Sequence, residues 1–320
     1  METEPYDLIA LGRVGVDLYP LRTGVALDRV ETFGRFLGGS PANVAVAAAR
    51  LGRRTALVSR TGADPFGAYL RRELTAFGVD ARWVTEVDGL PTPITFCEIF
   101  PPDDFPLHFY RRPKAPDLEI HPHELDLGAI RAARVLWATG TGLCEEPSRT
   151  ATLEALAARS GREVTVLDMD WRPAFWPDPA AARPYYAEAL RHATVAVGNL
   201  DECEVATGER EPRAAARALL ASGPGVRLAV VKQGPRGVLA VAADGTSVEV
   251  PPLPVEVVNG LGAGDAFGGA LVHGLLARWD LERILRHANA AGAIVAGRLA
   301  CSPAMPYAEE IAEALAKGTG

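Results

Sequence analysis

Short apolar, β-branched segments alternate with segments of helical periodicity along most of this 320-residue chain. Such alternation predicts βα units, and therefore a mostly parallel sheet with helices on both faces. The clearest strand candidates are Asp7–Leu11, Thr55–Ser59, Arg134–Ala138, Val164–Asp168, Val195–Val197 and Leu228–Lys232. The clearest helix candidates are Ala42–Leu51, Phe66–Phe77, Ser148–Arg159 and Ala180–Arg191. A sheet of this kind binds its ligands beyond the carboxyl ends of its strands.

Two segments, Val16–Phe36 and Thr92–Arg112, break this alternation and have the pattern of extended chain. We expect them to meet as a small β lid, formed by about residues 16–37 and 90–112, over the ligand-binding edge of the sheet. No internal repeat, low-complexity tract or linker divides the chain, so we expect residues 1–320 to form a single α/β domain.

Charge and composition argue against several classes of partner. The net charge is −7, with no basic run, so nucleic acid is not an expected partner. No apolar run is long enough to span a membrane, and the acidic N-terminus does not resemble a signal peptide. The four cysteines are scattered without a CxxC pair, which argues against a zinc site or a disulfide framework and favours the reducing cytoplasm.

A glycine-rich motif, VNGLGAGDAFGGALVHG, occupies Val258–Gly274. In it, Gly262, Ala263 and Gly264 lead into Asp265, and a helical pattern follows from Ala266. Glycine lets the backbone approach a ligand closely, and the first amides of a helix favour an anion such as a phosphoryl group. A carboxylate would repel phosphate, so its presence there fits a general base for an attacking hydroxyl. The alternative is a tight turn in which Asp265 is only the helix N-cap.

A second motif, Gly38-Gly39-Ser40-Pro41-Ala42-Asn43, precedes the first helix candidate. Ser40 as N-cap with Pro41 at the first helical position would explain two of these residues. It would not explain the paired glycines, nor a polar Asn43 within an apolar helix. Asparagine offers both a donor and an acceptor, as a polyol substrate requires.

These two motifs, with Gly52 and Gly62 at their spacings, resemble the signatures of the ribokinase-like (pfkB) carbohydrate kinases. The resemblance implies a ribokinase-like three-layer fold, with a mostly parallel central sheet and a small β lid, and a kinase that uses ATP and Mg²⁺. Asp265 would then be the base, and the amides around Gly262, Ala263 and Gly264 would stabilise the transferring phosphoryl group. The family usually has Asp-Thr where this chain has Asn259-Gly260. Many members build a monovalent-cation site there, so K⁺ is an additional candidate cofactor.

The resemblance also assigns binding residues elsewhere in the chain. The residues that it expects to contact the sugar are Asp17, Gly39 and Asn43. The Asn-x-x-Glu motif of Asn199 and Glu202 is expected to help place Mg²⁺ and phosphate through water, although an N-capped helix start would explain it as well. The residues expected on the nucleotide side are Lys232, Gly234, Gly237 and Asn289. A simple hairpin turn is the alternative explanation for the first three.

The segment Phe100–Leu118 resembles a particular branch of the family, the 5-dehydro-2-deoxygluconokinases of myo-inositol catabolism, as do Gly260-Leu261 and Leu299–Ser302. This branch phosphorylates the C6 hydroxyl of 5-dehydro-2-deoxy-D-gluconate. Tyr110-Arg111 and Arg172 resemble residues of the 2-keto-3-deoxygluconate kinases, where arginine meets the substrate carboxylate. Because only Lys114, Lys232 and Lys317 among the 33 basic residues are lysines, the position of an arginine is more informative than its identity.

Three functions therefore stay open. The first is 5-dehydro-2-deoxygluconokinase; the second is 2-keto-3-deoxygluconate kinase or another pfkB sugar kinase. The third is a regulator that binds sugar or nucleotide without turnover, against which the intact Gly262–Asp265 motif argues. The resemblance also predicts a homodimer through the lid, for which Phe33, Phe36 and Phe96 could supply an apolar surface. The alternative is that these lid aromatics cover the substrate.

Overall fold

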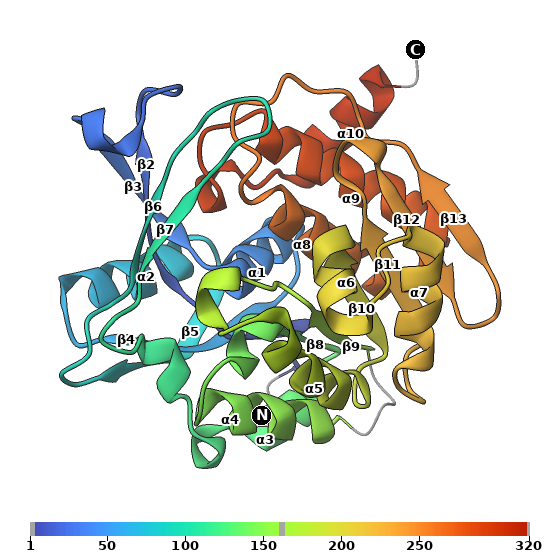
Figure 1. Cartoon of the computed structure of the whole chain (residues 1–320), viewed down its shortest axis with the longest axis horizontal. Helices are drawn as coiled ribbons and strands as arrows, with labels where there is room; N and C mark the ends of the chain where they lie inside the picture. Colours follow the sequence, from blue (N-terminus) through green and yellow to red (C-terminus); the bar gives the residue numbers. More distant parts are fainter. Residues whose placement is uncertain (1–3, 160–163, 319–320) are drawn as a thin grey trace.

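The computed structural model describes residues 4–159 and 164–318 and contains one large and one small sheet (Figure 1). The large sheet has the strand order β13-β12-β11-β10-β9-β8-β1-β4-β5. Its strands are β1 (Leu8–Leu11), β4 (Thr55–Gly62), β5 (Val79–Val87), β8 (Val135–Thr139), β9 (Val164–Asp168), β10 (Val195–Asn199), β11 (Leu228–Lys232), β12 (Val238–Ala242) and β13 (Ser247–Val250). The pairs from β11 through β8 and β1 to β5 are parallel, whereas β12 and β13 form an antiparallel edge. The predicted mostly parallel sheet is confirmed.

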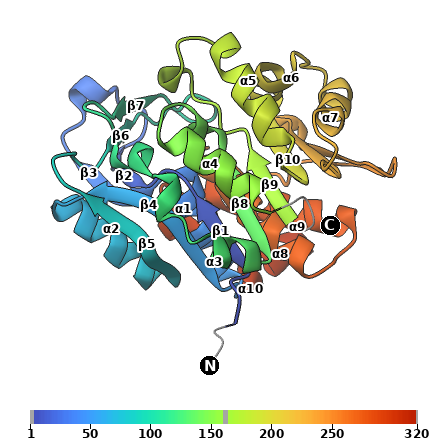
Figure 2. The same cartoon turned by 90° about the horizontal axis from the view of Figure 1, so that it is seen from below.

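Helices cover both faces of the large sheet (Figure 2). They are α1 (Ser40–Arg50), α2 (Pro65–Ala76), α3 (Leu127–Ala132), α4 (Ser148–Ala157), α5 (Pro179–Leu190), α6 (Leu200–Thr207), α7 (Pro212–Ala221), α8 (Ala263–Leu276), α9 (Leu281–Ala296) and α10 (Ala308–Lys317). Because successive strand residues point to opposite faces, Leu8 and Ala10 join the core under α1, α8 and α9, whereas Ile9 and Leu11 join the core under α4 to α7. The fold therefore has three layers, with an apolar core on each side of the sheet.

The small sheet has the strand order β3-β2-β6-β7. Its strands are β2 (Gly15–Pro20), β3 (Phe33–Gly38), β6 (Ile94–Cys97) and β7 (Leu107–Tyr110). All four lie in the two segments that break the βα alternation, and Figure 1 shows them together at one end of the molecule.

The register of the small sheet separates two faces. Asp17 lies opposite Phe36 on β3 and Thr95 on β6, so these three side chains share the inner face. Leu18 lies opposite Phe96, on the outer face. Phe36 therefore does not share a surface with Phe33 and Phe96, because a shift of three residues along a strand changes the face. Its position on the inner face agrees with the alternative that lid aromatics cover the substrate.

Two helix starts differ from the sequence prediction. Helix α1 begins at Ser40 with Gly39 as its N-cap, so Ser40 does not cap it and its hydroxyl is free for another role. Helix α8 begins at Ala263 with Gly262 as its N-cap, which places Asp265 inside the first turn rather than at the cap. Strands β5, β12 and β13 had not been predicted. Within the described residues, no helix combines the length and apolarity needed to cross a membrane.

Candidate active site

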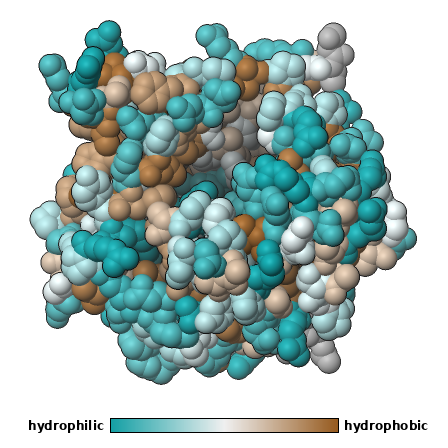
Figure 3. Space-filling model, viewed as in Figure 1, coloured by the Kyte–Doolittle hydropathy of each residue, from teal (hydrophilic) through white to brown (hydrophobic). Residues whose placement is uncertain are grey.

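Two cavities lie on either side of the first turn of α8. The first, which we call the polar cavity, is lined by Asp17, Gly39, Asn43, Arg172, Gly262 and Asp265 among others. The second, which we call the apolar cavity, has a volume of about 510 Å³ and is lined mainly by proline, valine and alanine side chains, with Lys232, Gly234, Gly237, Ala263, Gly264 and Asn289. The face of the molecule that Figure 3 presents is hollowed near its centre. Four consecutive residues are therefore divided between the two cavities: Gly262 and Asp265 line the polar cavity, and Ala263 and Gly264 line the apolar cavity.

Asp265 is held by two side chains of α1. Ser40 Oγ donates a hydrogen bond of 2.7 Å to one carboxylate oxygen, and Asn43 Nδ2 donates one of 2.8 Å to the other. Ser302 Oγ in turn donates to Asn43 Oδ1. Burial raises the pKa of Asp265, while the bonds from Ser40 and Asn43 act to lower it. The result is a carboxylate fixed in orientation and aimed into the polar cavity.

The first turn of α8 can hold an anion. Gly262 has φ +82°, and a Cβ atom there would lie 2.6 Å from Cys301 Sγ, so only glycine fits. The amides of Ala263 and Gly264 have no partners within the helix, whereas the Asp265 amide donates to Gly262 O at 3.1 Å. A Cβ atom on Gly264 would lie 3.5 Å from Lys232 Nζ, so the lysine ammonium lies close to these amides. Amides and ammonium together favour a phosphate at this position.

Lys232 ends β11 directly beside Asn199 at the end of β10. Its Nζ lies 3.8 Å from the carboxylate of Asp168, at the end of β9. Burial acts to lower the pKa of Lys232, but the surrounding carboxylates, Asp168 first, raise it above the ordinary value. The carboxyl ends of three neighbouring strands thus bring a cation and an acid to the phosphate-binding turn.

Asn199 and Glu202 form a reciprocal cap at the start of α6. Glu202 N donates to Asn199 Oδ1 at 2.9 Å, and Asn199 N donates to Glu202 Oε2 at 2.7 Å. The capping explanation is therefore correct for both residues, and each side chain keeps further oxygen lone pairs. Within residues 4–159 and 164–318, no three histidine, cysteine or acidic side chains come together as a metal site. These oxygens therefore fit Mg²⁺ only if water or phosphate completes its ligands.

The paired glycines Gly38 and Gly39 allow the small sheet to approach α1. A Cβ atom on Gly38 would lie 2.1–2.3 Å from the carboxyl group of Asp17, and one on Gly39 would lie 2.4 Å from the carbonyl oxygen of Arg13. Asp17 is buried and accepts a 3.2 Å hydrogen bond from the Tyr19 hydroxyl. Burial raises the pKa of Asp17 to about 6. Asp17 can therefore accept a hydrogen bond from a substrate hydroxyl at neutral pH.

The structure separates the predicted carboxylate-binding residues. Arg172 lines the polar cavity and is ion-paired with Asp170 at 2.6 Å. Arg111 forms a 2.6 Å ion pair with Asp117 and borders a different cavity, beside Phe175. Tyr110 lies on the outer face of the small sheet with 63% of its surface exposed, and its neighbour Phe109 faces the polar cavity instead. Arg111 and Tyr110 are therefore not brought to Asp17 and Asp265.

Several residues of the polar cavity had not been predicted. They are Arg13, Tyr19, Thr95, Phe109 and Cys301. Alternation along β2 from Asp17 would have found Tyr19, and the position directly after β1 could have indicated Arg13. Cys301 lies in the Leu299–Ser302 segment that resembles the kinase branch, but the pattern did not assign it to the site, which it reaches because the chain after α9 folds back against Gly262.

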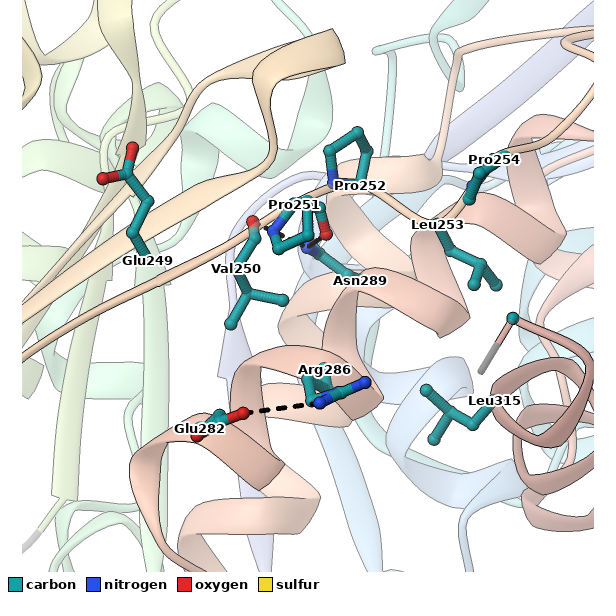
Figure 4. A pocket seen from close by; sticks show the side chains of 11 residues that line it. Glu249, Val250, Pro251, Pro252, Leu253, Pro254, Glu282, Arg286, Asn289 and Leu315 are labelled. Atoms are coloured by element: carbon teal, nitrogen blue, oxygen red, sulfur yellow. Dashed lines mark hydrogen bonds and ion pairs between the residues drawn. The ribbon is translucent and has the colours of Figure 1, made fainter. Parts of the chain in front are cut away.

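Asn289 does not offer its amide freely to the apolar cavity. Figure 4 shows its side chain turned toward the segment after β13, and Nδ2 donates to the carbonyl oxygens of Val250 (3.4 Å) and Pro251 (3.0 Å). This segment, with Pro252 and Leu253, walls both the apolar cavity and the smaller cavity drawn in Figure 4. Asn289 thus borders the nucleotide side and also fixes its wall.

The Asn259-Gly260 variant has a structural reason. Asn259 is fully buried; its Nδ2 donates to Leu299 O at 2.7 Å, and its Oδ1 accepts from Leu261 N at 3.0 Å. An aspartate could not make the first of these bonds. A Cβ atom on Gly260 would lie 2.8 Å from the ring of Phe105, so glycine makes room for the segment between β6 and β7.

Comparison with known proteins agrees with this arrangement. A family model described as pfkB family carbohydrate kinase matches residues 6–308. A protein of Clostridium tetani named 5-dehydro-2-deoxygluconokinase is 32% identical over 97% of this chain and 93% of its own length. A protein of Photobacterium profundum with the same name is 35% identical over 96% of this chain and 94% of its own length.

Solved structures share the fold over the whole chain. A fructokinase of Xylella fastidiosa with bound ATP superposes with a TM-score of 0.85 at 24% identity, covering 98% of this chain and 100% of that one. A double mutant of the fructokinase of Vibrio cholerae O395, in a form with bound fructose, ADP and potassium ion, has a TM-score of 0.82 at 25% identity. It covers 98% of this chain and 100% of that one.

Proposed function

This chain belongs to the pfkB family of carbohydrate kinases, and on that premise we propose that it phosphorylates the C6 hydroxyl of 5-dehydro-2-deoxy-D-gluconate, in the cytoplasm, as a step of myo-inositol catabolism. One observation carries the proposal. The residues from Gly262 to Asp265 border a polar cavity suited to a hydroxylated acid and an apolar cavity suited to a nucleotide. A phosphoryl group passing between the two would cross the first turn of α8.

In the proposed reaction, Asp265 orients the C6 hydroxyl and accepts its proton. The bond between the γ-phosphorus and the bridging oxygen of ATP breaks, and a bond from that phosphorus to the sugar oxygen forms. The amides of the α8 turn and the Lys232 ammonium balance the charge of the transferring group. Because the transition state of phosphoryl transfer is loose, positioning and charge compensation matter more than the strength of the base.

Mg²⁺ is the expected metal. Asn199 and Glu202 would hold it through water, next to the phosphates that Lys232 contacts. When bound, the ion would neutralise phosphate charge. The described residues supply oxygen ligands of the type that it prefers, although not a complete set.

The substrate class rests on the charges of the polar cavity and on the relatives' names. Arg172 reaches the cavity from the end of β9, and arginine is suited to a carboxylate. Asp17, Gly39 and Asn43 line the same cavity and would contact hydroxyl groups. Asn43 keeps one donor and one acceptor position beyond its bonds to Asp265 and Ser302.

The test is ADP release by the purified protein with Mg-ATP and a panel of 5-dehydro-2-deoxy-D-gluconate, 2-keto-3-deoxygluconate, fructose and ribose. We expect the first to give the highest kcat/KM. Preference for the second would assign the chain to the 2-keto-3-deoxygluconate kinases. Turnover of neutral sugars only would show that the substrate does not need a carboxylate group. Turnover of none, with ligand-induced stabilisation, would favour a regulator.

We also propose a homodimer through the small sheet. On its outer face Phe96 makes edge-to-face contacts with Phe33 and Tyr110, at centroid distances of 5.5 and 5.3 Å. Tyr110 is largely exposed, so this aromatic cluster offers an apolar surface that a second copy could cover.

A further inference from the structure

Of the three arginines at or near the proposed sugar site, Arg13 and Arg172 line the polar cavity and Arg111 borders another cavity, and two of the three already have anionic partners. Arg172 is paired with Asp170, and Arg111 is paired with Asp117. The third, Arg13, follows β1 directly and lines the polar cavity with Asp17 and Asp265. It is 7% exposed.

Arg13 has no anionic partner in the described part of the chain. None of the ion pairs found there includes it, and its Nε is buried without a hydrogen-bond partner. Its guanidinium carbon lies over the Phe109 ring, 5.4 Å from the ring centroid, and an aromatic ring supplies no anion. A buried guanidinium without an anion is costly, so the geometry favours an anionic ligand.

The carboxylate of Asp17 does not fill this role. Arg13 influences it electrostatically, yet the two are not joined by an ion pair, and Asp17 takes its hydrogen bond from Tyr19 instead. The backbone of Arg13 is fixed because Gly39 packs against its carbonyl group. The side chain is therefore anchored at its base and held by an aromatic ring, with its donors at the wall of the cavity.

We propose that Arg13 binds the carboxylate of the acid sugar, and that this contact, more than one with Arg172 or Arg111, selects acid over neutral sugars. This inference rests on the proposed function. Arginine presents parallel N–H donors that match the two oxygens of a carboxylate, which a neutral hydroxymethyl group cannot replace. Arg172, already paired with Asp170, would orient the other end of the site.

The test compares two substrates in one series of variants. One is 5-dehydro-2-deoxy-D-gluconate; the other is the same keto sugar with a hydroxymethyl group in place of the carboxylate. Arg13→Gln should reduce kcat/KM for the acid about 10- to 150-fold, chiefly through KM, because a hydrogen bond to a charged group is lost. The kcat/KM for the neutral sugar and the KM for ATP should change little. Arg13→Lys keeps the charge without the planar fork. Its kcat/KM for the acid should lie between those of the wild type and of Arg13→Gln.

Arg217→Gln is the matched control, since it removes the same charge from the exposed side of α7, at a residue that lines neither cavity, and should leave kcat/KM for both substrates unchanged. If wild type prefers the acid and Arg13→Gln keeps that preference, Arg13 is not the anchor and the proposed function stands. If wild type does not use the acid, the proposed function fails and this inference with it. Should Arg13→Gln not fold, the selectivity of Arg13→Lys decides, and an unchanged acid preference there would overturn the proposal.

Discussion

Replacing Asp265 by asparagine separates its role as a base from its role in the fold. Asp265 accepts hydrogen bonds from Ser40 Oγ at 2.7 Å and from Asn43 Nδ2 at 2.8 Å. In the variant, the new amide nitrogen can face Ser40, whose hydroxyl is able to accept as well as donate, while the remaining oxygen accepts from Asn43. Both bonds survive, and the cost of burying a charge disappears. We therefore expect no loss of stability.

Turnover should respond quite differently. A positioned general base contributes on the order of 10² to 10⁴ in rate, so Asp265→Asn should raise the activation barrier by about 3–5 kcal/mol. The assay is ADP release at saturating sugar and Mg-ATP, with thermal melting measured in parallel. The KM for ATP should stay close to the wild-type value, because the nucleotide cavity is lined by Ala263 and Gly264 but not by Asp265.

Asp178→Asn is the matched control. Asp178 caps α5 by accepting from Ala181 N at 2.8 Å, and asparagine caps a helix about as well. The control should keep full activity. Turnover of Asp265→Asn near the wild-type rate would refute the assignment of the base. A collapse of its melting temperature would instead refute the hydrogen-bond argument.

Four further predictions follow from the site. Burial raises the pKa of Asp17 to about 6, and the ionised carboxylate is the stronger acceptor for a sugar hydroxyl, so kcat/KM for the sugar should fall as the pH is lowered through about 6; a profile flat to pH 5 would contradict this. Gly38→Ala places a Cβ atom 2.1–2.3 Å from the carboxyl group of Asp17 and should destabilise the protein by about 1–3 kcal/mol while raising KM for the sugar but not for ATP; an unchanged sugar KM would show that Asp17 does not need this glycine. Because both polar atoms of Asn259 are occupied by backbone groups, replacing K⁺ by tetramethylammonium should leave turnover unchanged, and a large loss would restore K⁺ as a cofactor. Tyr110→Ser should weaken the proposed dimer, as measured by analytical sedimentation. A wild-type protein that stays monomeric at all concentrations would contradict the proposal of a dimer.

Much of the fold could be predicted because the relevant signals are local. Alternating apolar strands and helical periodicity identify the βα units, and the predicted strand at Thr55–Ser59 lies within the observed β4. Strand β5 was missed because its side chains alternate irregularly between buried and exposed positions. The antiparallel edge of β12 and β13 was missed because a hairpin there resembles an isolated turn in the sequence.

The site residues likewise divide into those that local signals in the sequence predicted and those that they did not. Glycines near Asp265 and the pair Gly38-Gly39 were recognisable because a tight turn or a close backbone approach excludes side chains, and this leaves a local mark. The partners of the charged residues were not recognisable. Arg111 and Arg13 look equivalent in an arginine-rich chain, yet one is neutralised by Asp117 and the other has no anionic partner among the described residues.

The sequence by itself determined the βα architecture, the anion-binding turn at Gly262–Gly264 and the acid that follows it. Only the tertiary structure decided that Ser40 and Asn43 converge on Asp265 from more than 200 positions away, and that Arg13 faces the cavity without a counter-ion. The physical reason is that backbone periodicity and turn geometry are set by neighbouring residues, whereas the convergence of side chains depends on strand order and register. Those are set by the packing of the whole sheet against its helices.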